Sequence, residues 1–423
     1  MNIIQRILNN LYNPFVYRLV SIQSRIQQVK SLFKKANIFY EKPHESENIL
    51  LIALYEKGIL REDISNLLIT AKKLGMYVIG INTLKLKDPD KYSNHFDTYI
   101  ERPNFGRDFG SYKYGFMHIF KRGLSVNCER LVLLNDSLFY SKDNLSLFLE
   151  QMSSTDKEVL GACENFEFMH HLGSFAIGIN KSILQHNKFR KYWYKYKNTD
   201  VRPLVIKRGE LGLSKALKRS SITGKLDCLY NKIEFSKHIA EIKDLKETIN
   251  LLPKGHTGGL GDPESIVLSP AIIYKLLYKH FFVLRNPFQE DKTVQIQQKE
   301  EQKNYEMFEL DDIINSIMDS FSNEYTDLDN NIIIETIRGY LIGQFSNGSQ
   351  IHRNALFLIK MKCPIIKLDL LYRGVFRDID IIAMSKLLNQ SQQFEFLDII
   401  FSRPYGAKCL TGIERAKFSA GLI

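Results

Sequence analysis

Apolar and polar positions alternate along the first half of the chain with two different periods. Short apolar runs bounded by glycine or polar residues predict buried strands over residues 47–58, 76–83, 96–102, 129–140, 158–166 and 174–180. Apolar residues at helical spacing predict helices over 61–75, 109–123, 143–152 and 181–196. Because strand and helix alternate throughout, we expect an α/β fold with an open, mostly parallel sheet flanked by helices on both faces.

The rest of the chain divides by composition. A polar stretch with few apolar residues, "EDKTVQIQQKEEQKNYE", predicts a linker or an exposed helix within 289–330. We therefore divide the chain into a basic amphipathic segment (1–45), an α/β domain (46–288), this linker (289–330) and a more helical C-terminal region (331–423). The sequence contains no internal repeat of fixed period.

The composition excludes a fibrous or disordered chain, because 44% of the 423 residues are hydrophobic and 25% are charged. The five cysteines are scattered without paired spacing, which predicts reduced, buried thiols rather than a zinc or redox site. No run of about 18 apolar residues occurs, and the N-terminus lacks a secretory h-region. We therefore expect a cytoplasmic protein that does not span a membrane.

The excess of positive charge, +11 overall, is concentrated in two places. Residues 1–36 contain six basic residues and no acid on an apolar background, and a second basic block covers 188–219. Such patches attract nucleic acid, anionic lipid or a phosphorylated substrate. No nucleic-acid-binding motif accompanies "FRKYWYKYK" in the second block, so a solvated helix face is the simpler interpretation and we expect no nucleic-acid partner.

A glycine-rich motif, "RPNFGRDFGSYKYG", joins the third predicted strand to a helix. Ligands of open α/β sheets bind beyond the carboxyl ends of the strands, where this motif lies. Gly106 and Gly110 allow close backbone approach, and helix N-terminal amides can face an anion. Asn104 and Asp108 can hydrogen-bond a nucleotide, and Arg107 can pair with phosphate. The alternative is a tight structural loop in which Asp108 caps the helix.

The fourth predicted strand ends in "LLNDS", at the same edge of the sheet. The carboxylate of Asp136, flanked by the side-chain oxygens of Asn135 and Ser137, is the kind of ligand set that Mg²⁺ or Mn²⁺ takes when water and phosphate complete its shell. An Asx turn that only closes the strand explains the same residues.

Two further candidates follow. His170 and His171 precede a buried strand, and neighbouring residues of an extended segment face opposite ways, so the pair is not expected to bind one metal. One of them can line the crevice at the strand ends. Glu210 follows a glycine at the start of a predicted helix, where it either complements the helix dipole or acts as a general base.

Taken in order, "NFGRDFGSYKYG", "LLNDSLFY", "HHLGSFAIGINKSIL", "FRKYW" and "VIKRGELGLSKAL" resemble the rhamnan synthesis protein F family. The resemblance covers residues 47–230 well and 350–376 more loosely, where "PIIKLDLL" looks like the family's closing strand. It implies a nucleotide-diphosphosugar-binding fold of the GT-A kind. It also implies a bacterial glycosyltransferase of cell-surface polysaccharide assembly.

The resemblance implies roles for particular residues. Asn135, Asp136 and Ser137 stand where many GT-A enzymes carry an Asp-x-Asp that holds a divalent cation and the donor diphosphate. In this sequence Asn135 stands in place of the first Asp of that motif, which leaves Mg²⁺ or Mn²⁺ dependence open. Glu210 corresponds to the base of inverting members, with Leu211 where an Asp is common. Asp136 and Glu210 are thus the expected catalytic residues.

The implied reaction is transfer of a sugar, with rhamnose as one candidate, from a nucleotide diphosphate to a capsule, O-antigen or wall rhamnan. Acceptors of this class are lipid-linked, so a basic amphipathic helix from residue 3 to about 33 is expected either to lie on the cytoplasmic membrane face or to pack on the protein's own body. A non-catalytic nucleotide- or glycan-binding protein on the same scaffold is the alternative function.

Overall fold

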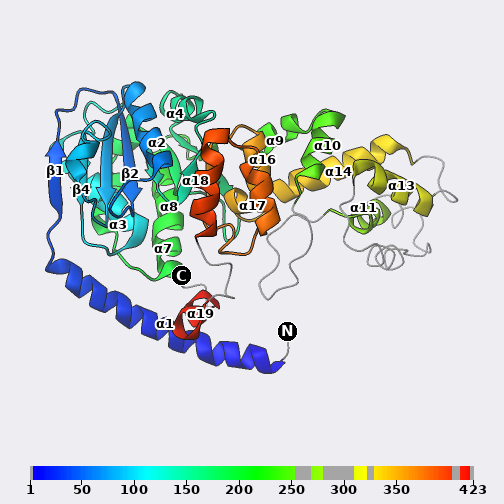
Figure 1. The fold of residues 1–423 in the computed structure, drawn as a ribbon, viewed down its shortest axis with the longest axis horizontal. Helices are drawn as coiled ribbons and strands as arrows, with labels where there is room; N and C mark the ends of the chain where they lie inside the picture. Colours follow the sequence, from blue (N-terminus) through cyan, green and yellow to red (C-terminus); the bar gives the residue numbers. More distant parts are fainter. Residues whose placement is uncertain (1–2, 253–267, 280–308, 322–327, 403–409, 420–423) are drawn as a thin grey trace.

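The computed structural model describes residues 3–252, 268–279, 309–321, 328–402 and 410–419, and the side chains of residues 14–252, 268–279, 309–320, 328–402 and 410–418. A sheet with helices on both faces forms one end of the molecule, helices of the C-terminal half extend from it, and α1 (Ile3–Leu32) runs along one side (Figure 1). No helix in the described ranges is both long enough and apolar enough to cross a membrane.

Eight strands form the main sheet, in the order β1-β4-β3-β2-β5-β10-β7-β11. β1 and β10 run against the other six, which are mutually parallel. The bounds are β1 Asn37–Glu41, β2 Asn48–Leu54, β3 Tyr77–Asn82, β4 Thr98–Glu101, β5 Arg130–Asn135, β7 Val159–Gly161, β10 Ala176–Asn180 and β11 Asp227–Cys228. The predicted α/β class and mostly parallel sheet are confirmed.

Helices bury both faces of the sheet because its central strands are apolar on both sides. In β2, Leu50 and Ile52 pack toward α2 (Glu62–Lys73) and α4 (Leu145–Ser153). Ile49 and Leu51 pack toward α3, α5, α6 and α8 on the opposite face. These four helices span Arg107–Arg122, Lys181–Gln185, Asn187–Lys195 and Leu211–Ser220.

Two smaller sheets complete the strand set. β6 (Leu138–Tyr140) pairs with β12 (Ile365–Lys367), and β8 (Glu164–Asn165) pairs with β9 (His171–Leu172). The strand predicted by the family resemblance in "PIIKLDLL" is therefore present as β12. The single strand predicted over 158–166 is instead divided between β7 and β8.

The C-terminal half is helical, as predicted. Its described helices are α9 Lys232–His238, α10 Ile242–Asn250, α11 Pro270–Leu277, α13 Leu310–Phe321, α14 Asn330–Phe345, α15 Gln350–Arg353, α16 Ala355–Lys360, α17 Asp378–Ser385, α18 Gln390–Phe401 and α19 Gly412–Ser419. One apolar cluster runs from β2 through the helices α9 to α16 to β12, so this part of the helical half shares a core with the sheet, whereas α17 and α18 pack in a second cluster.

Two predicted elements need correction. The expected linker or exposed helix at 289–330 contains α13, whose Ile313 and Ile317 are fully buried. Residues 289–308 and 322–327 of that segment lie outside the described part. The helix predicted over 181–196 is divided at His186, whose backbone is extended and whose Nδ1 accepts the Lys188 amide.

The cysteines that the structure describes, Cys128, Cys163, Cys228 and Cys363, are buried free thiols, as predicted; Cys409 lies outside the described residues. Burial raises the pKa of Cys128 to about 12, which keeps its thiol protonated at neutral pH.

Gly115 lets α3 approach β2, because a Cβ there would lie 2.4 Å from Leu51 Cδ1. Gly115→Ala is expected to lower the free energy of unfolding by about 1–2 kcal/mol, since overpacking outweighs the gain in helix propensity. Gly339→Ala, in α14 with open space around it, is the matched control and should raise stability by about 0.5–1 kcal/mol. Urea titration measures both, and equal effects would contradict the close packing of α3 on β2.

Candidate active site

The turn that follows β5 lies beside the end of β2. The Asp136 amide donates to the Ala53 carbonyl at 3.1 Å, continuing the parallel ladder. The Asp136 carboxylate accepts the backbone amide of Tyr55. Asp136 is therefore buried between two strand ends, where the parallel arrangement predicted that site residues would gather.

Arg61, just before α2, holds the other side of this turn. Its guanidinium donates to the carbonyls of Asp136 at 3.0 Å and Leu138 at 2.8 Å. It also pairs with the buried Asp63 at 2.9 Å, whose other oxygen accepts the Tyr140 amide. A single guanidinium thus binds the backbone carbonyls of Asp136 and Leu138, on either side of Ser137, in the turn between β5 and β6.

The two motifs identified in the sequence meet at this turn. Asn135 Nδ2 donates to Asp108 Oδ2 at 3.0 Å, which joins the end of β5 to the first turn of α3. Asn135 Oδ1 accepts from both the amide and the hydroxyl of Ser137, at 3.2 and 2.6 Å. Asn135, Asp108 and Ser137 therefore form one hydrogen-bonded group.

The glycine-rich loop does not have the open geometry that we expected. Gly106 has φ +93°, and its amide donates to Asp200 Oδ1 at 2.7 Å, so the anion at the start of α3 is a side chain of the same protein. Arg107 Nε donates to the Asp200 carbonyl at 3.0 Å. We expected the amides at the start of α3 to face an anion of the ligand, and the Asp200 carboxylate takes that place at Gly106.

The glycines instead provide room for protein atoms. A Cβ at Gly110 would lie 2.6 Å from the Phe105 carbonyl and 2.7 Å from Arg102 Nη2. The Arg102 guanidinium binds the Phe105 carbonyl at 2.6 Å and the Arg107 carbonyl at 2.8 Å. Burial lowers the pKa of Arg102 to about 10, so this arginine stays charged while it holds the loop. Asn104 is exposed at the loop's surface.

The two histidines diverge, as their adjacency predicted. His170 Nε2 lies 2.6 Å from Glu164 Oε2. His171 Nδ1 lies 2.7 Å from the Met169 carbonyl, which can only accept, so Nδ1 carries a proton. His171 Nε2 then faces Glu210 Oε2 at 3.6 Å. Only His171 joins the candidate site.

Glu210 does not begin a helix, contrary to our prediction. A continuous helical segment runs from α7 (Arg202–Val205) through a π turn (Ile206–Glu210) into α8. Gly209 packs on the Phe109 ring, where a Cβ would lie 2.8 Å from two ring carbons. The glycine thus serves close packing, and the π turn directs Glu210 toward His171.

Glu210 and His171 form an ion pair. Burial opposes ionisation of Glu210, but the nearby imidazolium of His171, together with Lys367 and Arg202, lowers the pKa of this carboxyl. Burial likewise disfavours the imidazolium, but Glu210 and the Met169 carbonyl raise the pKa of His171. Glu210 is therefore ionised at neutral pH, which is the state that a proton acceptor needs.

Lys367 is a site residue that our sequence analysis missed. It is the last residue of β12, paired with Leu138 of β6, and its Nζ donates to Ser137 Oγ at 2.6 Å. The ammonium lies 5.3 Å from the centroid of the Phe175 ring. The sequence did contain a signal, since Lys367 is a charged residue within the apolar segment "PIIKLDLL". The local pattern of apolar residues could not show that this segment lies beside "LLNDS".

The C-terminal region brings a further charged group, Asp369, close enough to Lys367 for the two charges to interact. The Asp369 carboxylate accepts from Arg373 and lies 3.1 Å from His352 Nε2. Burial opposes its ionisation, yet His352, Arg373 and Lys367 hold the pKa of Asp369 well below its usual range. The candidate site therefore combines residues of the sheet with residues of the C-terminal region.

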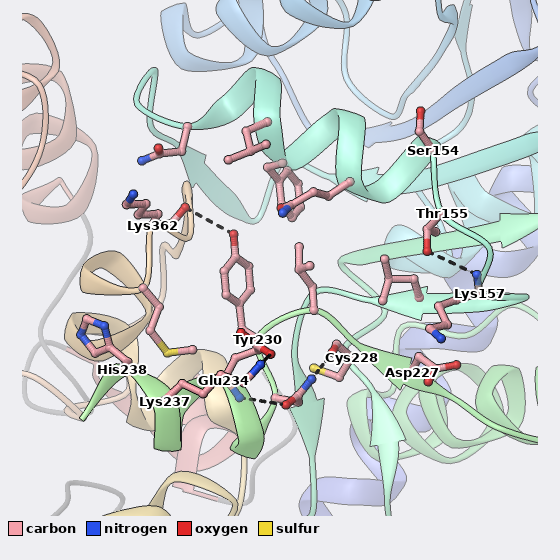
Figure 2. Close-up of a pocket in the computed structure, with 18 residues that line it drawn as sticks. Ser154, Thr155, Lys157, Asp227, Cys228, Tyr230, Glu234, Lys237, His238 and Lys362 are labelled. Atoms are coloured by element: carbon pink, nitrogen blue, oxygen red, sulfur yellow. Dashed lines mark hydrogen bonds and ion pairs between the residues drawn. The ribbon is translucent and has the colours of Figure 1, made fainter. Parts of the chain in front are cut away.

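The basic block of 188–219 forms a separate groove of about 820 Å³ between α6 and α8. Its basic lining includes Lys188, Lys191, Lys195, Arg208, Lys215 and Arg219. Another pocket of about 820 Å³ lies between α4, the β11–α9 connection and Lys362 (Figure 2). None of the expected site residues lines either cavity.

Residues 76–240 match the model of a known family, described as "Rhamnan synthesis protein F". The resemblance seen in the sequence is confirmed. The segment that matches rhamnan synthesis protein F contains Asp108, Asn135, Asp136, His171 and Glu210, whereas Lys367 lies beyond it.

Other similarities cover smaller shares of the proteins concerned. An uncharacterized protein, y4gN, of Sinorhizobium fredii is 25% identical over 41% of this chain and 46% of its own length. The virulence protein VirA of Vibrio anguillarum is 30% identical over 28% of this chain and 38% of its own. The chain thus spans less than half the length of these relatives.

Among solved structures, the glycosyltransferase GlyE of Streptococcus pneumoniae is 12% identical, with 71% of this chain and 64% of that one covered and a TM-score of 0.25. A score this low does not establish a common fold, so the fold class rests on the sheet itself.

Asp136→Asn is expected to change how stability depends on pH. Burial, with the charges of Glu56 and Asp108, raises the pKa of Asp136 to about 7, above the value of about 3.9 in an unfolded chain. The protonated carboxyl therefore stabilises the fold fully below pH 4 and progressively less up to about pH 7.

Between pH 5 and 8 the wild type should lose about 2–3 kcal/mol of unfolding free energy relative to Asp136→Asn, whose amide does not titrate. Urea titrations of both proteins at pH 5, 6.5 and 8 measure the difference. Parallel pH profiles of the two proteins would contradict the raised pKa.

Proposed function

We propose that this protein is a glycosyltransferase that transfers a sugar, rhamnose being our first candidate, from a nucleotide diphosphate to a hydroxyl of a bacterial surface polysaccharide. One observation carries the proposal. The segment that matches rhamnan synthesis protein F brings Asp108, Asn135 and Glu210 to the carboxyl edge of a mostly parallel sheet. Ligands of such sheets bind at that edge.

The proposed reaction is a single displacement with inversion at the anomeric carbon. Glu210 takes the proton of the acceptor hydroxyl, whose oxygen forms the new bond to that carbon. The bond from the anomeric carbon to the diphosphate oxygen breaks, and its electron pair leaves with the diphosphate. His171 keeps Glu210 ionised and oriented before the proton arrives.

The donor is proposed to lie along the turn after β5. Asn135 and Ser137 are proposed at the diphosphate, with Asp136 holding the turn between the ends of β2 and β5. Asp108 and Asn104 are proposed at the nucleotide end of the donor. The acceptor is proposed to be lipid-linked or a growing polysaccharide.

Glu210→Gln is expected to lower kcat by about 10²–10⁴-fold while leaving binding of nucleoside diphosphate within a factor of three, because the amide keeps the volume but cannot accept the proton. Release of nucleoside diphosphate from a panel of nucleotide sugars, with a purified polysaccharide acceptor, measures turnover. Glu234→Gln, in a surface pair with Lys237, is the control and should keep wild-type turnover.

A wild-type protein that binds nucleotide sugars but turns none of them over would favour the non-catalytic alternative. Wild-type turnover by Glu210→Gln would remove Glu210 as the base and leave the transferase activity standing.

We further propose that α1 lies on an anionic membrane surface. Val16 and Val20 pack on the protein's own body against Val201 and Ala416, and Ser24 Oγ accepts the Asp200 amide. Packing on the body, one of the two expected arrangements, therefore accounts for one face of the helix.

A second face of α1 is apolar and exposed. Ile22, Ile26 and Val29 are each about half exposed, at 55%, 49% and 54%, and their spacing places them within about 60° of one another around the helix, together with Phe15. Arg18, Arg25 and Lys30 are exposed along α1, and no acid precedes Glu41 in the chain. An apolar stripe beside cations complements anionic lipid.

The double variant Ile22→Asp with Ile26→Asp should bind vesicles containing phosphatidylglycerol at least tenfold more weakly than the wild type, because it places two carboxylates on the apolar stripe. Vesicle flotation measures binding. Ile222→Asp with Ile233→Asp, at two exposed isoleucines outside α1, is the matched control and should float like the wild type. Equal flotation of both double variants would remove the membrane role of α1.

A further inference from the structure

We infer that the ammonium of Lys367, rather than a divalent cation, is the positive charge that receives the donor diphosphate. The inference rests on the proposed function and names how its site binds the donor. It also makes the C-terminal region part of the active site, although Lys367 lies outside residues 76–240, which match the family model.

The backbone holds Lys367 in place. β12 pairs with β6 so that Lys367 lies opposite Leu138, and the Leu368 amide donates to the Ser137 carbonyl at 3.1 Å. At the other end of the pair, the Ser141 amide donates to the Pro364 carbonyl at 2.7 Å. Hydrogen bonds on both sides of the lysine therefore direct its side chain to the turn after β5.

The end of this side chain has the surroundings of an anion-binding group. Its Nζ donates one hydrogen bond to Ser137 Oγ, at 2.6 Å, and an ammonium has three N–H donors. The charge of Lys367 acts on Asp108 and Glu210, where it counters the effect of burial on both carboxyls. Lysine binds phosphate as a point charge, which suits a group that lies beside the turn.

Most of the oxygens that a metal would need are already engaged. Asn135 Oδ1 accepts two hydrogen bonds from Ser137, Asp136 Oδ2 accepts the Tyr55 amide, and Ser137 Oγ accepts from Lys367. In the ranges that the structure describes, no three His, Cys, Asp or Glu side chains are arranged to hold a metal. A divalent cation at this turn would also be repelled by the lysine. The donor set therefore does not fit Mg²⁺ or Mn²⁺.

In the proposed displacement, Lys367 acts where charge develops. As the bond from the anomeric carbon to the diphosphate oxygen breaks, the electron pair moves onto the diphosphate, next to the ammonium. The proton of the acceptor hydroxyl goes to Glu210, so no further co-reactant is needed. Transfer by this route is independent of divalent metal.

Binding of dTDP and UDP to the full-length protein tests the inference, with isothermal titration calorimetry in EDTA and again in Mn²⁺. The wild type should bind one of these probes with the same Kd, within a factor of two, in both buffers. Lys367→Met, which keeps the apolar stem, should weaken binding at least tenfold, and Lys367→Arg should restore part of it. Binding of the uncharged nucleoside should change less than threefold in either variant.

Lys362→Met is the matched control. It lies five positions earlier and its exposed side chain lines the pocket of Figure 2, so wild-type binding is expected. Thermal unfolding of each variant identifies any loss of fold.

The outcomes separate the inference from the proposed function. Binding that EDTA abolishes and Mn²⁺ restores, or wild-type affinity in Lys367→Met, would overturn the role of Lys367 while leaving a nucleotide-binding transferase. A wild-type protein that binds neither nucleoside diphosphate in either buffer would overturn both.

Discussion

The guanidinium of Arg61 is the contact on which the geometry of the candidate site depends. It is largely buried, so its N–H groups need acceptors within the protein. Asp63 balances its charge, and the carbonyls of Asp136 and Leu138, on either side of Ser137, take its other donors. This holds the turn after β5 in one conformation. It also sets the position of β6, the strand that receives β12.

Around that turn, the protein balances buried charges against one another. Glu210 is paired with His171, and Lys367 lies in the field of Asp108, Glu210 and Asp369. Because an ion buried alone is costly, Glu210 stays ionised only with His171 and the other cations around it in place. An entering diphosphate therefore competes with the protein's own carboxylates for the same cations, which favours a ligand carrying more than one negative charge.

Elements with a local signal could be predicted from the sequence. β2, β3, α2 and α3 follow apolar runs or helical periods that end at glycine or polar residues, and β5 ends at Asn135 as expected. Contacts between distant segments could not. The anion at the start of α3 is Asp200, which lies 94 residues after Gly106, and Lys367 lies 230 residues after Ser137. A local pattern holds no information about such partners, and a three-residue strand such as β12 is too short for its period to identify it.

The pairing of β12 with β6 has a consequence for how the protein is made. Chains emerge from the ribosome N-terminus first, so the sheet, α3 and the turn after β5 can all fold before residue 365 has been synthesised. Until then β6 presents an unpaired edge, and such edges attract strands of other chains. A product of premature termination before β12 would therefore keep the central strands but expose this edge to aggregation.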